Sequence, residues 1–197
     1  GELGVKSIMY AGEGEPMIHK DIDGIVRMTK KSGIDVSFTT NGTVIKDSFV
    51  EQSLQYISWI KVSMNAGKAS TYAKIHQTDE LDFNKVIGNI KKIMRFKRDQ
   101  GLSLSVGVQA LLLPENTGEM ERLTKLCRDE MGVDYLVVKP YSQHRFSETH
   151  LYEKVDYSRS FELGKQLEQL STKEFNVIFR AQTIKKYLEP EENRYSK

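Results

Sequence analysis

Residues 102–113 read Leu-Ser-Leu-Ser-Val-Gly-Val-Gln-Ala-Leu-Leu-Leu, in which apolar side chains alternate with small or polar ones. Side chains of a β-strand point alternately to its two faces, so this stretch predicts a strand with one apolar and one polar row. Residues 35–41, Asp-Val-Ser-Phe-Thr-Thr-Asn, and residues 61–65, Lys-Val-Ser-Met-Asn, follow the same alternation. Three strands therefore offer one face to covering helices and a second, polar face to a chamber or to solvent.

Strand-like and helix-like segments follow one another along the chain. The predicted strands are Val5–Ala11, Asp35–Thr40, Ile57–Met64, Leu102–Leu113, Asp134–Pro140 and Phe175–Ala181. The predicted helices are His19–Ser32, Lys46–Gln55, Ser70–Thr78, Phe83–Gln100, Thr117–Met131 and Asp156–Leu170. Such an order is typical of a parallel sheet or barrel with helices outside. We therefore predict an α/β fold, a partial (β/α)6 barrel of the TIM type over residues 1–187, followed by a charged tail at 188–197.

The polar strand faces indicate how such a barrel would be used. A closed barrel usually fills its interior with branched apolar residues. Small and polar interior residues instead favour a wide chamber that accommodates a ligand. An open sheet with one face in solvent is the alternative. We favour the chamber, because six repeats would otherwise leave their helices without a second surface.

Composition restricts the classes of function. The formal net charge is +2, which is too small to predict nucleic-acid binding. The densest basic run, residues 91–98, ends an amphipathic segment and predicts a solvated helix face rather than a phosphate site. No apolar run is long enough to span a membrane. The single cysteine, Cys127, excludes an internal disulfide, predicts a cytoplasmic location and cannot by itself ligate an iron–sulfur cluster.

A candidate binding loop follows the first predicted strand, where residues 10–16 read Tyr-Ala-Gly-Glu-Gly-Glu-Pro. Glycine permits backbone conformations closed to other residues and lets a ligand approach the main chain. Pro16 favours an extended Glu15 and donates no hydrogen bond. The resulting turn has exposed carbonyls and two carboxylates but no basic residue. It suits an ammonium group, whereas phosphate needs N–H donors and positive charge. A plain acidic turn is the alternative.

This loop resembles, as a Gly-Glu-Gly-Glu-Pro variant, the Gly-Gly-Glu-Pro motif that follows the second strand in the radical S-adenosylmethionine (SAM) superfamily. Later strand ends resemble the pattern of that family in the same order. They are Thr39–Gly42, Val62–Gly67, Val108–Asn116 and Val138–Ser142. The ordered set covers about residues 5–143. The resemblance implies a partial barrel that lacks the first strand and cluster loop of the family, with SAM as a cofactor.

The resemblance also implies roles for individual residues. The cofactor-binding candidates are Gly12, Glu13, Gly14, Glu15, Ser63, Asn65 and Gln109. The four loop residues would hold the methionine ammonium group by their carbonyls and negative charge. Ser63 and Asn65 would bind the ribose hydroxyls or the carboxylate, unless they only cap a strand end. Gln109 would face the chamber near the nucleoside.

Substrate-facing candidates follow the fifth predicted strand. They are Lys139, Tyr141, Gln143 and His144. Lys139 and Tyr141 are the catalytic candidates, because both would lie on one strand face and could relay a proton or bind a substrate carboxylate. Solvent-exposed loop residues without such a role are the alternative.

The family binds a 4Fe–4S cluster through three cysteines in a Cys-x3-Cys-x2-Cys loop after its first strand, and this sequence contains no such loop. Cys127 lies in a helical pattern among leucines and is predicted to be a core residue. We therefore expect no metal ligands in this chain, which alone would neither hold the cluster nor cleave SAM. We expect a fragment of a longer protein, with a cysteine-rich, SPASM-like extension after Lys197 as in related proteins.

Three functions remain open. The favoured one is a fragment of a radical SAM enzyme of the oxidoreductase or transferase type. Its cluster, reduced by an external donor such as flavodoxin or ferredoxin, would cleave SAM, and the 5′-deoxyadenosyl radical would abstract a hydrogen from a peptide or small metabolite. A non-catalytic remnant that binds a nucleoside or partner protein is the second. The third is a lysine-dependent barrel aldolase or isomerase that uses Lys61 or Lys139.

Overall fold

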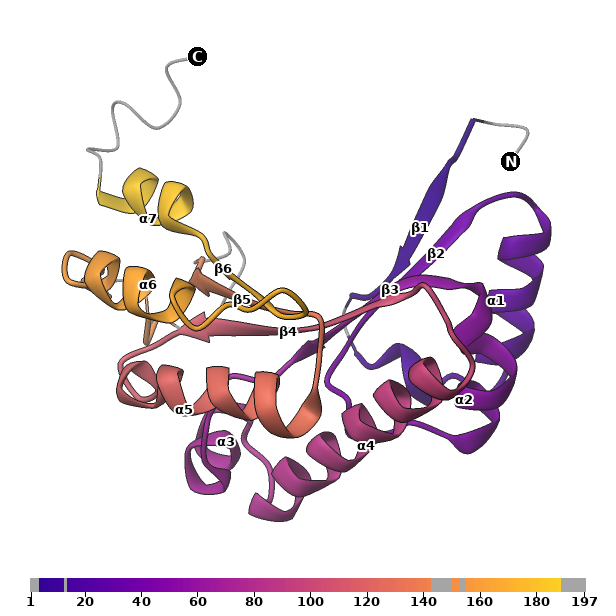
Figure 1. Ribbon diagram of the computed structural model, residues 1–197, viewed down its shortest axis with the longest axis horizontal. Helices are drawn as coiled ribbons and strands as arrows, with labels where there is room; N and C mark the ends of the chain where they lie inside the picture. The colour runs from indigo at the N-terminus through magenta and orange to yellow at the C-terminus, as the bar shows by residue number, and fades with distance from the viewer. Residues whose placement is uncertain (1–3, 13, 143–149, 153–154, 189–197) are drawn as a thin grey trace.

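The computed structural model describes residues 4–12, 14–142, 150–152 and 155–188. Its strands form one parallel six-stranded sheet in sequence order (Figure 1). They are β1 (Ser7–Tyr10), β2 (Asp35–Thr40), β3 (Ile57–Ser63), β4 (Ser105–Leu112), β5 (Tyr135–Pro140) and β6 (Asn176–Phe179). Within the described residues β1 and β6 do not pair with each other, so the sheet is open. The predicted α/β fold, an incomplete barrel of parallel strands, is confirmed.

Helices connect successive strands. They are α1 (Ile22–Lys31), α2 (Asp47–Ser53), α3 (Ala69–His76), α4 (Glu80–Asp99), α5 (Met120–Lys125), α6 (Ser160–Glu168) and α7 (Ala181–Leu188). Shorter helical turns are η1 (Pro16–Ile18), η2 (Leu54–Tyr56), η3 (Thr117–Glu119) and η4 (Leu126–Met131). Helices α1 to α5 lie on one side of the sheet, while α6 packs against β6 and α7 against β5 (Figure 1). None of the described helices combines the length and apolar character that crossing a bilayer requires.

The core lies between the sheet and helices α1 to α5. Alternate residues of each central strand are almost completely buried there, such as Phe38, Ile60, Val108 and Leu136, each 0% exposed. Burial of one such side chain contributes about 1.5–3 kcal/mol relative to leaving it exposed. The intervening residues face the opposite side of the sheet. The period-two alternation therefore assigns one strand face to the core and leaves the other for a site.

The ends of the predicted helices shift by a few residues, and two segments differ more. The segment predicted as one helix at 117–131 comprises three consecutive helical segments, η3, α5 and η4, of which the last has the wider π-type hydrogen bonding. Residues 181–188 form α7, whereas the sequence prediction ends a strand at Ala181 and gives no helix after it. The prediction was wrong there because β6 passes into α7 without any glycine or proline to mark the change.

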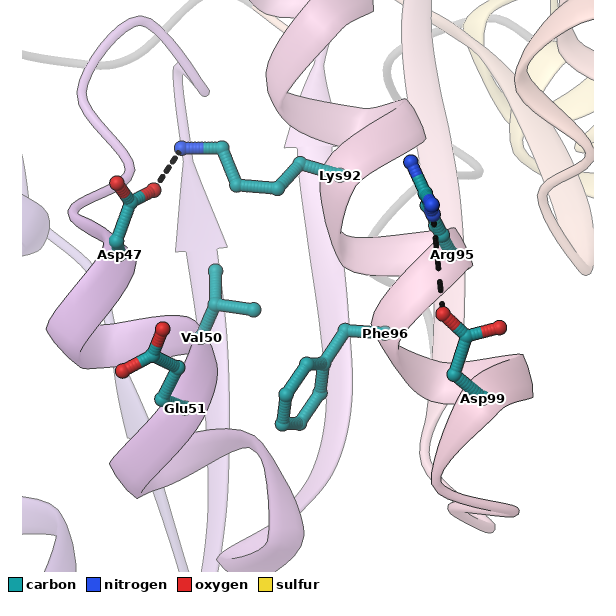
Figure 2. A pocket seen from close by; sticks show the side chains of 7 residues that line it. All are labelled: Asp47, Val50, Glu51, Lys92, Arg95, Phe96 and Asp99. Atoms are coloured by element: carbon teal, nitrogen blue, oxygen red, sulfur yellow. Dashed lines mark hydrogen bonds and ion pairs between the residues drawn. The ribbon is translucent and has the colours of Figure 1, made fainter.

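A shallow groove on the outer surface separates α2 from α4 (Figure 2). Lys92 forms an ion pair with Asp47 at 2.7 Å across the groove, and Arg95 pairs with Asp99 at 3.7 Å along α4. Lys97, in the same basic run, pairs with Asp134 at 2.6 Å. Carboxylates therefore balance the charges of these three cations.

Candidate cofactor and substrate chamber

The sheet face opposite the core lines a cavity of about 600 Å³, which we call the chamber. Its lining residues are Ser58, Trp59, Lys61, Ser105, Gln109, Tyr135, Val137, Lys139, Ile178, Arg180 and Thr183. They come from strands β3 to β6 and from the start of α7. Ligand pockets typically enclose about 300–1,000 Å³, so the chamber is large enough for a metabolite.

One wall of the chamber depends on a glycine. Lys61, Gly107 and Tyr135 are successive partners across β3, β4 and β5. A Cβ atom at Gly107 would lie 2.2 Å from atoms of the Tyr135 ring, so the ring crosses β4 where a side chain is missing. Glycine at this position therefore permits the aromatic wall.

Three cationic side chains enter the chamber from different strands: Lys61 from β3, Lys139 from β5, and Arg180 directly after β6. Burial, followed by the positive charges of Lys139 and Arg180, lowers the pKa of Lys61 from its ordinary value of 10.5. The Lys61 ammonium lies 5.6 Å from the centroid of the Trp59 ring, within cation–π range. The described lining contains no carboxylate. The chamber is therefore positively charged.

The glycine loop lies at the carboxyl end of β1. Its described residues do not line the chamber. Gly12 and Gly14 have φ angles of +122° and +112°, which residues with a side chain rarely adopt. A Cβ atom at either position would meet nothing within 4 Å, so a ligand can approach the backbone. Glu13 lies outside the described residues. The exposed main chain fits a group that donates hydrogen bonds, as the ammonium of SAM does.

The carboxylate of Glu15 joins this loop to the end of β2. Its Oε1 accepts hydrogen bonds from the Thr40 hydroxyl at 2.6 Å and from the Met17 N–H at 3.0 Å. Its Oε2 accepts one from the Asn41 N–H at 2.7 Å. Three donors occupy most of the acceptor capacity of a carboxylate. The structure thus adds an anchoring role to the predicted contact of Glu15 with an ammonium group.

Two asparagines bind the ends of β3 and β4 to each other. The side chain of Asn116, 0% exposed, donates to the carbonyls of Asn65 at 2.6 Å and Leu111 at 2.7 Å, and accepts from the Leu113 N–H at 2.9 Å. The Asn65 Oδ1 accepts from the Leu111 N–H at 2.8 Å. From the sequence, Asn116 is expected only as a helix cap at the end of the Val108–Asn116 stretch, and its side chain caps no helix in the structure. The Oδ1 atom of Asn65 therefore already has a protein partner, while its side-chain nitrogen Nδ2 can still donate to a ligand.

The remaining predicted site residues are distributed as follows. Ser63 and Gln109 are register partners on β3 and β4, and Gln109 and Lys139 both line the chamber. Tyr141 lies beyond β5 and packs its ring against Tyr152 at 5.4 Å. Tyr141 follows directly on β5, which ends at Pro140, and it is not among the described residues that line the chamber with Lys139. Gln143 and His144 lie outside the described residues.

The cysteine of this chain does not fit an iron–sulfur cluster. Cys127 is 0% exposed in the core, and burial raises the pKa of its thiol. Thiolates, not thiols, ligate metals. Of the side chains the structure describes, no group of three or more His, Cys, Asp or Glu is arranged to hold a metal ion. The prediction that Cys127 is a core residue is confirmed, and the cluster ligands are not among the residues of this sequence.

A family model described as Radical SAM superfamily matches residues 1–127. The chain belongs to this superfamily. Radical SAM proteins use SAM and a 4Fe–4S cluster, so the cofactors implied by the glycine loop are those of the family. The relatives of this chain include enzymes, which supports its assignment to an enzyme of this superfamily.

Two curated relatives show what the radical SAM chain resembles in sequence. It is 25% identical over 136 residues to the tungsten-containing aldehyde ferredoxin oxidoreductase cofactor-modifying protein of Pyrococcus furiosus, covering 68% of this chain and 37% of that protein. It is 39% identical over 90 residues to a probable GTP 3′,8-cyclase of Saccharolobus islandicus, covering 45% of this chain and 28% of the cyclase. The chain thus spans well under half the length of either relative.

Solved structures share the fold. Streptococcus suis SuiB bound to its precursor peptide SuiA superposes with a TM-score of 0.69 at 20% identity, over 96% of this chain and 42% of SuiB. A domain of the pyruvate-formate lyase-activating enzyme of Bacteroides vulgatus superposes with a TM-score of 0.62 at 10% identity, over 88% of this chain and 98% of that domain. At these identities the likeness concerns the fold alone.

Proposed function

We propose that this chain forms the SAM-binding loop and substrate chamber of a radical SAM enzyme that abstracts a hydrogen atom from its substrate. The observation that carries the proposal is the exposed, positive-φ backbone of Gly12 and Gly14 at the carboxyl end of β1 in a member of this superfamily. SAM, bound with a reduced cluster, would supply the 5′-deoxyadenosyl radical. The parent protein would obtain its electron from an external donor such as flavodoxin or ferredoxin.

The residues of this chain would bind and orient the cofactor. The carbonyls of Gly12 and Gly14 would accept hydrogen bonds from the methionine ammonium, and Glu15 would hold them in place through its bonds to β2. Ser63 and Gln109, adjacent across β3 and β4, would bind the ribose hydroxyls or the carboxylate. The amide nitrogen of Asn65 would add a donor beside them.

The chamber would receive the substrate. Lys139 is the candidate to bind or protonate it, since this side chain lines the cavity near the carboxyl end of β5. A peptide or a small metabolite fits the proposal: SuiB was solved with a precursor peptide, and the cyclase is named for GTP. A cytoplasmic location remains a prediction.

The test uses the full-length protein, prepared without oxygen, and a matched pair of glycine substitutions. Gly14→Ala places a Cβ at a positive φ, which costs about 1–2 kcal/mol and should weaken SAM binding on the order of tenfold. Gly88→Ala, on the exposed side of α4 with nothing within 4 Å of its Cβ, is the control and should leave binding unchanged. Calorimetry measures the affinity, and chromatography measures 5′-deoxyadenosine. Absence of SAM binding by the wild-type protein, or equal binding by both variants, contradicts the proposal.

A lysine-dependent aldolase or isomerase is a second candidate because burial and neighbouring cations lower the pKa of Lys61, as an imine-forming lysine requires. Borohydride reduction with pyruvate should then label Lys61, and mass spectrometry of the digested protein would locate the adduct. An unlabelled Lys61 removes this candidate.

A further inference from the structure

We propose that the chamber recognises its substrate by an anionic group, a phosphoryl or a carboxyl, held jointly by Lys61, Lys139 and Arg180. This inference rests on the proposed function, because it names the substrate class of the same chamber. From the sequence, Lys61 and Lys139 are separate catalytic candidates, and Arg180 lies in a predicted strand without a role.

The three side chains line the same cavity although they come from different parts of the sheet. Lys61 is opposite Gly107, over which the Tyr135 ring lies. The Arg180 N–H donates to the Val138 carbonyl at 2.9 Å, so Arg180 continues the parallel ladder beside Lys139 at the carboxyl end of the sheet. All three cations line one cavity. Lys139 and Arg180 are also near enough to Lys61 for their charges to act on its ammonium group.

Within the described part of the chain, these cations have no carboxylate partner. No ion pair among the described residues involves Lys61, Lys139 or Arg180. The outer groove between α2 and α4 is different, because its lysine and arginine are paired with aspartates (Figure 2). Burial, and after it the like charges of Lys139 and Arg180, disfavour the ionised form of Lys61 and lower its pKa. A bound anion would remove this repulsion.

The rest of the lining suits the remainder of such a substrate. Arginine presents a planar fork that matches phosphate and carboxylate oxygens, and lysines add point charges. Trp59 and Tyr135 offer apolar ring surfaces, while Gln109 and Thr183 offer polar groups. A metabolite of a few hundred cubic ångströms with one anionic end therefore fits the chamber better than a cationic or wholly apolar one.

The experiment measures binding of two probe anions to the full-length protein by calorimetry at one fixed salt concentration. Pyrophosphate tests for the phosphoryl group, and malonate tests for the carboxyl group. Lys139→Met and Arg180→Gln should each weaken the preferred probe on the order of tenfold, the usual range for a lost hydrogen bond to a charged group. Arg180→Lys should restore part of the affinity. Lys31→Met, at the exposed end of α1, is the control and should change nothing.

SAM affinity is measured on the same variants. The inference is supported when a probe binds, the chamber variants lose it and SAM affinity stays within about twofold of wild type. The preferred probe then identifies the phosphoryl or the carboxyl as the recognised group. It is overturned when neither probe binds, when Lys31→Met weakens binding as much as Arg180→Gln, or when SAM affinity falls together with probe affinity. In the last case the cations hold the SAM carboxylate. If the wild-type protein does not bind SAM, the result contradicts the proposed function instead.

Discussion

The hydroxyl of Thr40, 3% exposed at the end of β2, donates a 2.6 Å hydrogen bond to the carboxylate of Glu15 in the glycine loop. The same hydroxyl accepts a hydrogen bond from the Gly42 N–H at 3.0 Å. A single buried oxygen thus connects the loop after β1 with the turn after β2. The position of the proposed ammonium site depends on this connection.

Thr40→Val should loosen the loop, because valine keeps the shape of threonine but leaves the Gly42 N–H without its partner. We expect a loss of about 1–3 kcal/mol in the free energy of unfolding, measured by urea titration, and weaker SAM binding. Thr40→Ser keeps the hydroxyl and should retain most of both properties. Unchanged SAM affinity in Thr40→Val would show that the loop is positioned without this bond.

Gly107→Ala should disturb the chamber wall, because the new Cβ would overlap the Tyr135 ring. Overpacking of this kind costs about 1–3 kcal/mol. Removing the ring in Tyr135→Ala should make the alanine at position 107 nearly harmless, so a double-mutant cycle should give a coupling of similar size. Additive effects of the two substitutions would contradict the contact. Gly88→Ala is again the control.

Asn116→Ala should be strongly destabilising, because this side chain braces the ends of β3 and β4. It leaves the carbonyls of Asn65 and Leu111 and the Leu113 N–H without a partner in a buried position. At about 1–3 kcal/mol for each unsatisfied buried group, we expect a loss of roughly 3 kcal/mol or more in urea unfolding. Asn176→Ala, at an exposed position, should stay within about 0.5 kcal/mol of wild type. Equal effects of the two substitutions would refute the bracing role.

Lys61 should make stability depend on pH at the alkaline side. Its folded pKa is lowered, first by burial and then by Lys139 and Arg180, while its unfolded pKa is near 10.5. Between these two values the unfolded chain binds more protons, so stability rises with pH across that interval and is lost as pH falls through it. Tyr135 also lines the chamber, and burial raises the pKa of its hydroxyl above the ordinary value of 10.0.

Lys139→Met removes one repulsive charge and should therefore raise the pKa of Lys61, measured by NMR of ¹³C-methylated lysines. Lys31→Met should leave that pKa unchanged. If Lys61 titrates at the same pH in wild type and Lys139→Met, the two ammonium groups do not share the chamber as described.

The strand faces could be predicted from the sequence because alternation is a local property. Ser37, Lys61 and Gln109 all lie on the non-core face, as the period of two requires. The glycine loop could also be predicted from the sequence, because Gly12 and Gly14 adopt backbone angles that few other residues tolerate.

What the sequence could not show depends on distances between segments far apart in the chain. Arg180 falls in a predicted strand, and nothing near it indicates that it lines the same cavity as Lys61. Asn116 is one amide after a strand, and its importance arises only because the end of β3 lies within hydrogen-bond reach. Helix α7 follows β6 with no turn residue between them. In each case tertiary packing supplies the partner.

From β2 to β5 most even-numbered residues pack on the helices and most odd-numbered ones face the opposite side, except at the start of β3, where Ile57 is buried and Ser58 lines the chamber. Substitutions at odd positions can therefore alter the lining while the packing against the helices stays as it is. The two sets of positions are free to diverge at different rates, one restrained by folding and the other by the molecule that is bound. A protein built in this way can acquire a new ligand through a handful of exchanges at every second residue, and its architecture stays the same.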